Sequence, residues 1–283
     1  MYEAKFVNDN GDQFLFSLSS GIAFDIDPLS GIDVSVASSQ GFNQVGETVT
    51  GMSVGGIRRR ITGVVTDKRN DVQIAKRIRR ALGALGRGTL HVGGLFCEAI
   101  VQKTPEFTRL KNGVLTFSAQ VFCPLPYWQS EEETVKTLGG YTPAYRLPIN
   151  FSTPHRFGVK SSGAFVNCSN PGEVDAPFSV RFLSTSQSTD YAIININTLA
   201  ELRIHDTLMA GDTVTVGRQD GRLYVVKTNE DGTKTDLFYA LDEGSTLFSL
   251  APGDNVLKAT AQSGEASLIA YVTYSGAYTG VDV

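Results

Sequence analysis

Hydrophobic and polar residues alternate along most of the chain with a period of two. The clearest runs are residues 32–36, 115–121, 178–182 and 268–274. Successive side chains of a β-strand point to opposite faces, so each run predicts a strand with one buried face and one wetter face. Glycine, with 29 residues of 283, supplies turns between many short strands. The pattern predicts an all-β protein.

One segment has the spacing of an α-helix instead. Its large hydrophobic residues recur every three or four positions, with lysines and arginines between them, at Ile74, Ile78, Leu82 and Leu85. Asn70 is the expected N-cap, with Gln73 as its capping-box partner, and glycines beyond residue 82 favour an end to the helix. We therefore predict a single basic, amphipathic α-helix over about residues 71–86.

A domain boundary is expected between residues 139 and 160, where glycine and proline gather. The charge changes there as well, from +2 over residues 1–147 to −6 over residues 148–283. Hydrophobic residues make up 41% of the chain, which is enough to build two cores. We predict two mainly β domains, residues 1–145 and residues 146–283.

The sequence contains none of the common catalytic motifs, such as GxSxG, HExxH or a phosphate-binding loop. The histidines and cysteines are widely separated, at His91, His155, His205, Cys97, Cys123 and Cys168. The cysteine spacing fits no zinc site, so buried free thiols in a reducing cytoplasm are expected. We predict no catalytic residue, no metal, no cofactor and no enzymatic activity.

The chain has no apolar run of the length that a membrane helix needs, and its first residues lack the basic and apolar parts of a secretory signal. We therefore expect no membrane insertion and no signal peptide. A formal charge of −4 gives no general attraction to nucleic acid.

Positive charge is concentrated between residues 57 and 87, which carry ten lysines and arginines against two aspartates. The segment contains no aromatic residue that could stack on a base. We interpret it as a subunit interface; a nucleic-acid patch and a solvated surface are the alternatives. The interface candidates are Arg58, Arg59, Arg60, Arg77 and Arg80. On a strand, Arg59 should face away from its two neighbours.

The run from Phe122 to Trp128 contains two prolines, which end a strand because proline cannot donate to the ladder. Tyr127 and Trp128 can then anchor the chain against the core or against a neighbouring subunit. Trp128 therefore joins the interface candidates. An aromatic platform for a sugar is the alternative.

The order of these motifs resembles the distal tail protein (Dit) family of long-tailed, non-contractile bacteriophages. In the first half the motifs are Ser39-Gln40-Gly41, the glycines from 46 to 56, the strand Ile57–Val65, the basic helix and Phe122-Cys123-x-x-Pro126-Tyr127-Trp128. In the second half they are Asn170-Pro171-Gly172, Leu208-x-x-Gly211-Asp212 and Ser245-x-x-Phe248-x-Leu250-x-Pro252-Gly253-Asp254-Asn255. The resemblance covers nearly the whole chain.

The resemblance implies an N-terminal β-barrel-like, ring-forming domain and a C-terminal galectin-like β-sandwich. It implies a homohexameric ring at the virion tail tip, assembled in the host cytoplasm. Such a ring joins the tail tube protein to tail-tip proteins, a tail-associated lysin and receptor-binding proteins. Double-stranded DNA would pass through its channel as cargo only.

Two other functions compete with this one. A carbohydrate-binding adhesion module would bind a glycan through exposed aromatic residues of the second domain, for which the candidates are Tyr191, Tyr224, Phe238 and Tyr239. A cell-wall hydrolase would need a paired carboxylate site, which the sequence does not mark.

Overall fold

The computed structural model describes residues 2–139, 141–143, 158–160, 165–219, 222–245 and 248–282. Within these ranges it contains many strands and one α-helix, which confirms the predicted fold class. The chain divides into two compact units: unit 1 comprises residues 1–131 and 278–283, and unit 2 comprises residues 132–277. The expected boundary between residues 145 and 146 lies outside the described residues.

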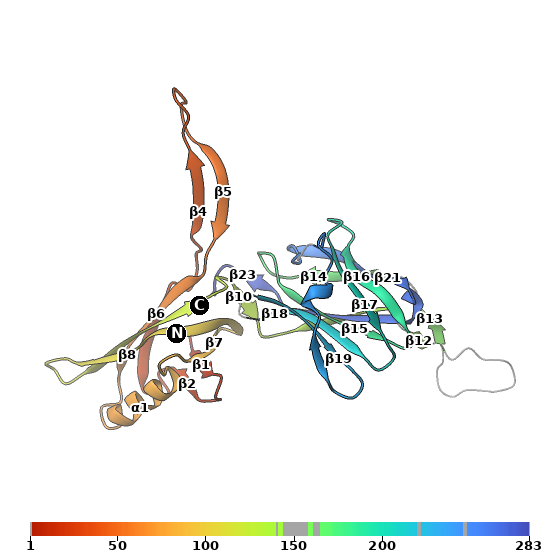
Figure 1. Cartoon of the computed structure of the whole chain (residues 1–283). Helices are drawn as coiled ribbons and strands as arrows, with labels where there is room; N and C mark the ends of the chain where they lie inside the picture. Colours follow the sequence, from red (N-terminus) through yellow and green to blue (C-terminus); the bar gives the residue numbers. More distant parts are fainter. Residues whose placement is uncertain are drawn as a thin grey trace. The chain divides into compact units, whose positions relative to one another are not determined.

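Unit 1 is built on one antiparallel sheet in the order β2-β1-β7-β8-β9-β6-β3 (Figure 1). These strands are β1 (Ala4–Asn8), β2 (Gln13–Phe16), β3 (Ile22–Asp27), β6 (Ile57–Val65), β7 (Arg87–Val92), β8 (Leu95–Arg109) and β9 (Leu115–Cys123). The short strand β10 (Trp128–Ser130) pairs with β8. The sheet is curved so that its two edge strands approach each other. The ring of Phe16 on β2 lies 5.8 Å from that of Phe24 on β3.

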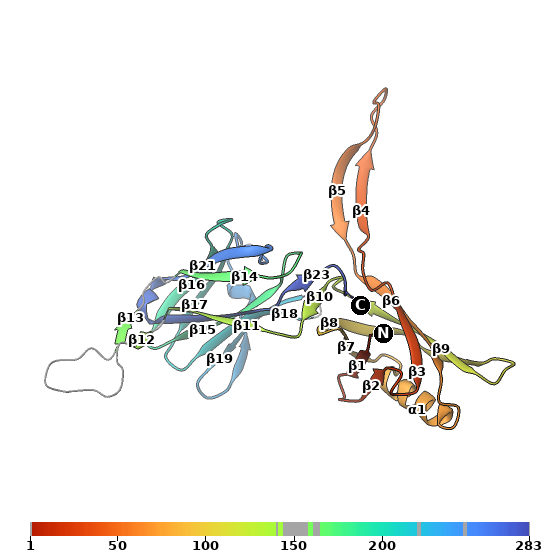
Figure 2. The same cartoon turned by 180° about the vertical axis from the view of Figure 1, so that it is seen from behind.

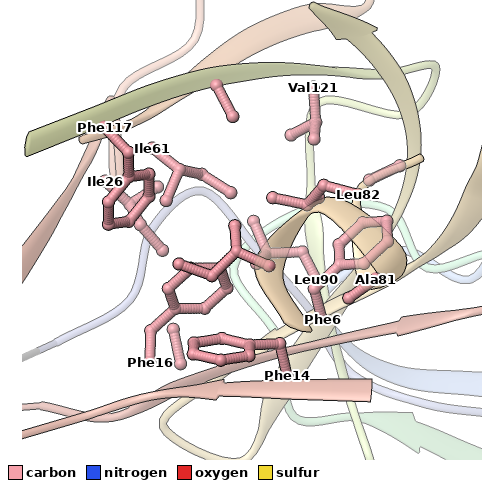
Figure 3. Packing of buried hydrophobic residues seen from close by; sticks show 14 of the residues in the cluster. Phe6, Phe14, Phe16, Ile26, Ile61, Ala81, Leu82, Leu90, Phe117 and Val121 are labelled. Atoms are coloured by element: carbon pink, nitrogen blue, oxygen red, sulfur yellow. The ribbon is translucent and has the colours of Figure 1, made fainter. Parts of the chain in front are cut away.

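The core of unit 1 fills the inside of this curved sheet (Figure 3). Every second residue of β9 is buried, as its period of two predicts. The helix α1 (Asp71–Ala81) adds Ile74 and Ile78 to the same core and packs against β1, β2 and β8. Each large apolar side chain buried here contributes about 1.5–3 kcal/mol to folding.

Both ends of α1 differ from the prediction. Asn70 makes no capping hydrogen bond with its side chain. Instead Asp67 Oδ1 accepts hydrogen bonds from the backbone N–H groups of Arg69 (3.0 Å) and Asn70 (3.3 Å). The helix ends at Ala81 because the next residue, Leu82, has left the helical conformation. Leu85 therefore lies beyond the helix, 93% exposed, although it continues the helical spacing.

A separate two-stranded ribbon extends from the sheet of unit 1 (Figures 1 and 2). Its strands, β4 (Val34–Ser39) and β5 (Thr48–Val54), pair with each other and with no other described strand. The alternation over residues 32–36 predicted a strand with one buried face, and that burial is absent. Every residue of β4 and β5 is exposed, because the ribbon leaves the body of unit 1 before β4 begins.

Unit 2 is a β-sandwich of two antiparallel sheets (Figure 2). One sheet has the order β11 (Thr134–Gly139), β22 (Leu268–Tyr274), β15 (Phe178–Ser184), β18 (Thr213–Gln219), β19 (Arg222–Thr228) and β20 (Lys234–Asp236). The other has the order β14 (Phe165–Asn170), β21 (Gly253–Ser263), β16 (Ser188–Asn195) and β17 (Glu201–Leu208). Phe182 and Tyr191 pack across the interior with their ring centroids 5.1 Å apart.

Smaller elements complete the described chain. They are the paired strands β12 (Tyr141–Pro143) and β13 (Gly158–Lys160), the 3-10 turns η1 (Phe238–Ala240) and η2 (Glu265–Ser267), and β23 (Ala277–Tyr278). The end of the chain returns to unit 1, where Gly280 bridges to Ser30 and Val281 joins the core. The described part of the chain has no helix with the length and hydropathy of a membrane-spanning segment.

Candidate interaction surface

The ribbon β4–β5 has one apolar face and one polar face. Directly opposed residues of an antiparallel pair share a face, and Val34 opposes Val54 while Val36 opposes Met52. The polar face carries the opposed serines Ser35 and Ser53. The ribbon is therefore amphipathic, although no part of unit 1 covers its apolar face.

A β-bulge extends this apolar face toward the tip of the ribbon. The register shifts after Ala37, so that Ser38 opposes Val49 and Thr50 is the extra residue. By alternation along β4, Ser38 lies on the same face as Val36, and Val49 joins that face with it. Beyond it, Phe42 at the tip is 98% exposed. The result is a continuous apolar stripe made of Val34, Val36, Val49, Met52 and Val54.

The root of the ribbon is fixed by two buried side chains. Trp128 donates a hydrogen bond from Nε1 to the carbonyl of Leu29 (2.9 Å). Arg59 donates from Nη1 to the carbonyl of Pro28 and from Nη2 to that of Pro126 (3.0 Å). The guanidinium also stacks on the Trp128 ring. Residues just before β4 are thus held rigidly, which sets the direction in which the ribbon leaves unit 1.

A hollow of about 590 Å³ lies beside this root. It is lined by backbone and side chains from both legs of the ribbon, among them Pro28, Ile32, Gly56 and Arg58. Gly56 has no room for a larger residue, since a Cβ atom there would lie 2.8 Å from the carbonyl oxygen of Cys123. The tight join between the ribbon and β6 therefore requires glycine at this position.

The six predicted interface residues do not form one surface. Arg59 and Trp128 are only 1% and 0% exposed and belong to the interior of unit 1. Arg58 and Arg60 are exposed on the outer face of β6, which confirms that Arg59 points the opposite way. Arg58 lies over the ring of Phe122, with its guanidinium carbon 5.8 Å from the ring centroid.

The other two candidates lie on α1. Arg77 is placed over the ring of Phe14, 5.4 Å from its centroid, and Arg80 forms an ion pair with Asp12 (2.8 Å). The helix packs on the core side of the sheet, whereas Arg58 and Arg60 point away from the core. The basic segment of the sequence is therefore divided between two sides of the sheet of unit 1.

The described histidines bind carboxylates in separate places, while His155 lies outside the described residues. His91 contacts Glu131 (Nδ1 to Oε1, 2.6 Å). His205 lies between two carboxylates, with Nε2 2.8 Å from Asp242 and Nδ1 3.1 Å from Asp190. Hydrogen bonds to Asp242 and then to Asp190 raise the pKa of His205 above its ordinary value. The described residues include no group of three or more potential metal ligands arranged to hold an ion.

The cysteines are free and buried, as the sequence predicted. The structure adds a proximity that the sequence did not indicate, because Cys97 Sγ and Cys123 Sγ are 3.5 Å apart. Among the aromatic sugar candidates, Tyr191 is buried and Tyr224 is half-buried. Phe238 and Tyr239 in η1 are 51% and 81% exposed.

Comparison with known proteins relates this geometry to phage tails. Residues 171–278 match the family described as "Siphovirus-type tail component, C-terminal domain". No curated protein sequence matches the chain.

Among solved structures, the SPP1 Dit (gp 19.1) protein matches with a TM-score of 0.64 and 13% identity, over 97% of this chain and 98% of that one. That protein is described as a paradigm of the hub adsorption apparatus in phages that infect Gram-positive bacteria. Chains of the phage P2 baseplate, activated with Ca or Sr, match at a TM-score of 0.50 and 11% identity, over 96% of this chain and 97% of each of those. The chain thus matches the siphovirus-type tail component family over residues 171–278 and is similar in fold to SPP1 Dit over nearly its whole length.

Proposed function

We propose that this protein is the hub of a siphophage tail tip, where six copies form a ring around a channel. The likeness of its fold to a phage hub and to baseplate chains supports this role. The ring would join the tail tube to tail-tip, lysin and receptor-binding proteins. Double-stranded DNA would pass through the channel without being bound tightly, since strong phosphate binding would impede its passage.

The observation that carries the proposal is the uncovered apolar stripe of the ribbon β4–β5. A two-stranded ribbon alone is marginally stable in water, and contiguous exposed apolar surface marks an interaction site. Met52 is 74% exposed at the centre of this stripe. A contact between the ribbon of one copy and a different face of the next is heterologous, and such contacts form a ring when the rotation from copy to copy closes.

The receiving face that we propose is the outer side of β6 and β9. Val64 is exposed there, and Arg58 and Arg60 lie on the same side of the strand. The ribbon carries acidic Asp33 and Glu47 and no basic residue from 33 to 55. Apolar contact and opposite charge therefore both favour this pairing. Arg77 and Arg80 on α1 remain predicted as a second contact, and Arg59 and Trp128 act behind the interface by fixing the ribbon's root.

Sedimentation velocity of the full chain tests this arrangement. The wild type should form a six-fold species, and Arg58→Glu combined with Arg60→Glu should shift it toward the monomer. The thermal midpoint of the double variant should stay close to that of the wild type, because both side chains are exposed. A double variant that stays hexameric would contradict the proposed receiving face.

A second candidate function is glycan binding by unit 2. The neighbouring exposed rings of Phe238 and Tyr239 favour it, since aromatic faces can stack on sugar rings. The bridge between Ile204 and Leu241 joins β17 to the end of this turn, and His205 beside it offers polar groups together with its partners Asp190 and Asp242. Glycan-array binding by the full chain that disappears in Tyr239→Ala would establish this function, and an array without signal would exclude it.

A further inference from the structure

Two thiols from neighbouring strands meet in the core of unit 1. Cys97 lies on β8 and Cys123 ends β9, and their sulfur atoms are 3.5 Å apart. Both side chains are buried and free. Buried cysteines usually serve as small apolar residues. A pair at this separation is different, because the two sulfur atoms already lie in contact with each other between neighbouring strands.

A buried cation accompanies the pair. Arg59 comes from β6, which pairs with β9 and places Ile57 opposite Cys123. Its guanidinium is satisfied by two backbone carbonyls and the Trp128 ring, while its Nε has no hydrogen-bond partner. A buried charge without a counter-charge is costly. Arg59 lies close enough to lower the pKa of both thiols, so a thiolate there would supply the missing negative charge.

The two thiols have different environments. Burial raises the pKa of Cys97 well above its ordinary value. The hydrogen bond with Cys97 lowers the pKa of Cys123, and Arg59 adds to that effect. Because the thiolate is the reactive form of cysteine, these opposite directions favour Cys123 as the attacking sulfur and Cys97 as the thiol that responds to it, a division of roles that the single variants test.

We propose that Cys123 and Cys97, beside Arg59, form an oxidisable dithiol that a small peroxide converts into an intramolecular disulfide between β8 and β9. The Cys123 thiol ionises and its thiolate attacks one oxygen of hydrogen peroxide; the O–O bond breaks, and the departing hydroxide takes up the proton that Cys123 released and leaves as water. The resulting sulfenic acid is attacked by the Cys97 sulfur. The S–S bond forms as the S–O bond breaks, and the second hydroxide leaves as water with the Cys97 proton.

The atoms and electrons of this reaction balance. Two thiols lose two electrons in total, and one peroxide molecule becomes two water molecules. The oxidation also removes the thiolate that faces Arg59. Because Arg59 holds the Pro28 carbonyl, the covalent state of the pair acts on the residues at the root of the ribbon. This inference rests on the core of unit 1 and is independent of the proposed tail function.

Peroxide treatment of the folded full chain tests the proposal. After quenching, the protein is unfolded and alkylated with N-ethylmaleimide, and its peptides are measured by mass spectrometry. Two alkylation sites should be lost together, and a peptide linking Cys97 to Cys123 should appear. Cys168 is the matched control within the same chain, since it is buried and free and burial raises its pKa to about 11. It should remain alkylated throughout.

Single variants assign the roles. In Cys97→Ser, dimedone should trap a sulfenic acid on Cys123, whereas in Cys123→Ser it should leave Cys97 unlabelled. The wild-type experiment needs neither variant to fold. Oxidation of Cys168 at the same rate as the pair, or complete oxidation without a linked Cys97–Cys123 peptide, would overturn the proposal. Dimedone labelling of Cys97 in Cys123→Ser equal to that of Cys123 in Cys97→Ser would overturn the division of roles.

Discussion

The guanidinium carbon of Arg59 lies 4.3 Å from the centre of the Trp128 ring, and both side chains are buried. The aromatic face stabilises a cation that has carbonyls but no carboxylate as hydrogen-bond partners. Together the two residues hold the carbonyls of Pro28 and Leu29. This pair therefore links the core of unit 1 to the root of the ribbon β4–β5.

Truncation of Trp128 should destabilise unit 1 strongly. Trp128→Ala removes the ring that covers Arg59 and the bond to Leu29, so we expect a loss of about 3–5 kcal/mol in the free energy of unfolding. Chemical denaturation followed by circular dichroism measures it. Tyr127→Ala, at the half-buried neighbouring position, is the matched control and should cost clearly less. Equal losses in the two variants would contradict the role given to Trp128.

The start of α1 gives a prediction that separates two adjacent candidates. Asp67→Ala should lower the thermal midpoint more than Asn70→Ala, because Asp67 accepts the backbone hydrogen bonds before the helix. Hydrogen bonding, first from the Asn70 side chain, lowers the pKa of Asp67. Its contribution is therefore present above the unfolded-state pKa and is lost as the pH falls through the folded-state pKa. A larger effect of Asn70→Ala would show that the sequence-based cap was correct.

Unit 2 depends on a nearly buried lysine. Lys227 Nζ lies 2.9 Å from Asp206, 3.6 Å from Asp212 and 2.6 Å from the Thr207 carbonyl. Lys227→Met leaves the two carboxylates without this partner, so unfolding should become easier by about 3 kcal/mol. Lys234→Met, at an exposed position of β20, is the control and should have little effect in the same denaturation experiment. No difference between the two variants would contradict the assignment.

The stability of unit 2 should depend on pH through His205. Its pKa is raised in the folded state, first by the hydrogen bond to Asp242 and then by that to Asp190. A raised pKa gives stability that is complete below the unfolded-state pKa of histidine and is lost as the pH rises through the folded-state pKa. The melting temperature of the wild type should therefore fall over that range. His205→Gln should remove this part of the pH dependence, and an unchanged profile would contradict it.

The sequence predicts the strands better than it predicts what covers them. The alternation over residues 115–121 and 268–274 corresponds to strands with one buried face, because neighbouring strands in the same unit cover that face. The same pattern around Val34 and Val36 lies on a ribbon that no part of unit 1 covers. Local periodicity reports that a face is apolar, and it contains no information on whether the cover comes from the same chain.

The local pattern of the sequence also does not predict which distant residues come into contact. The alternation along β6 predicts that Arg59 faces away from Arg58 and Arg60, but only the packing of unit 1 shows that it is buried against Trp128. Cys97 and Cys123 are separated by a long hairpin in sequence and come together through strand pairing. Leu85 continues the helical spacing, yet the helix ends earlier because Leu82 leaves the helical conformation while remaining in the core.

The oligomeric mass of ribbon variants in solution tests the central claim most directly. Val36→Asp with Met52→Asp charges the apolar stripe, whereas Ser35→Asp with Ser53→Asp adds the same charge to the opposite face of the same strands. Native mass spectrometry should find six-fold assemblies for the wild type and the serine variant, and monomers for the apolar-stripe variant. Hexamers that persist when the apolar stripe is charged, or a wild type that stays monomeric at every concentration, would contradict the account.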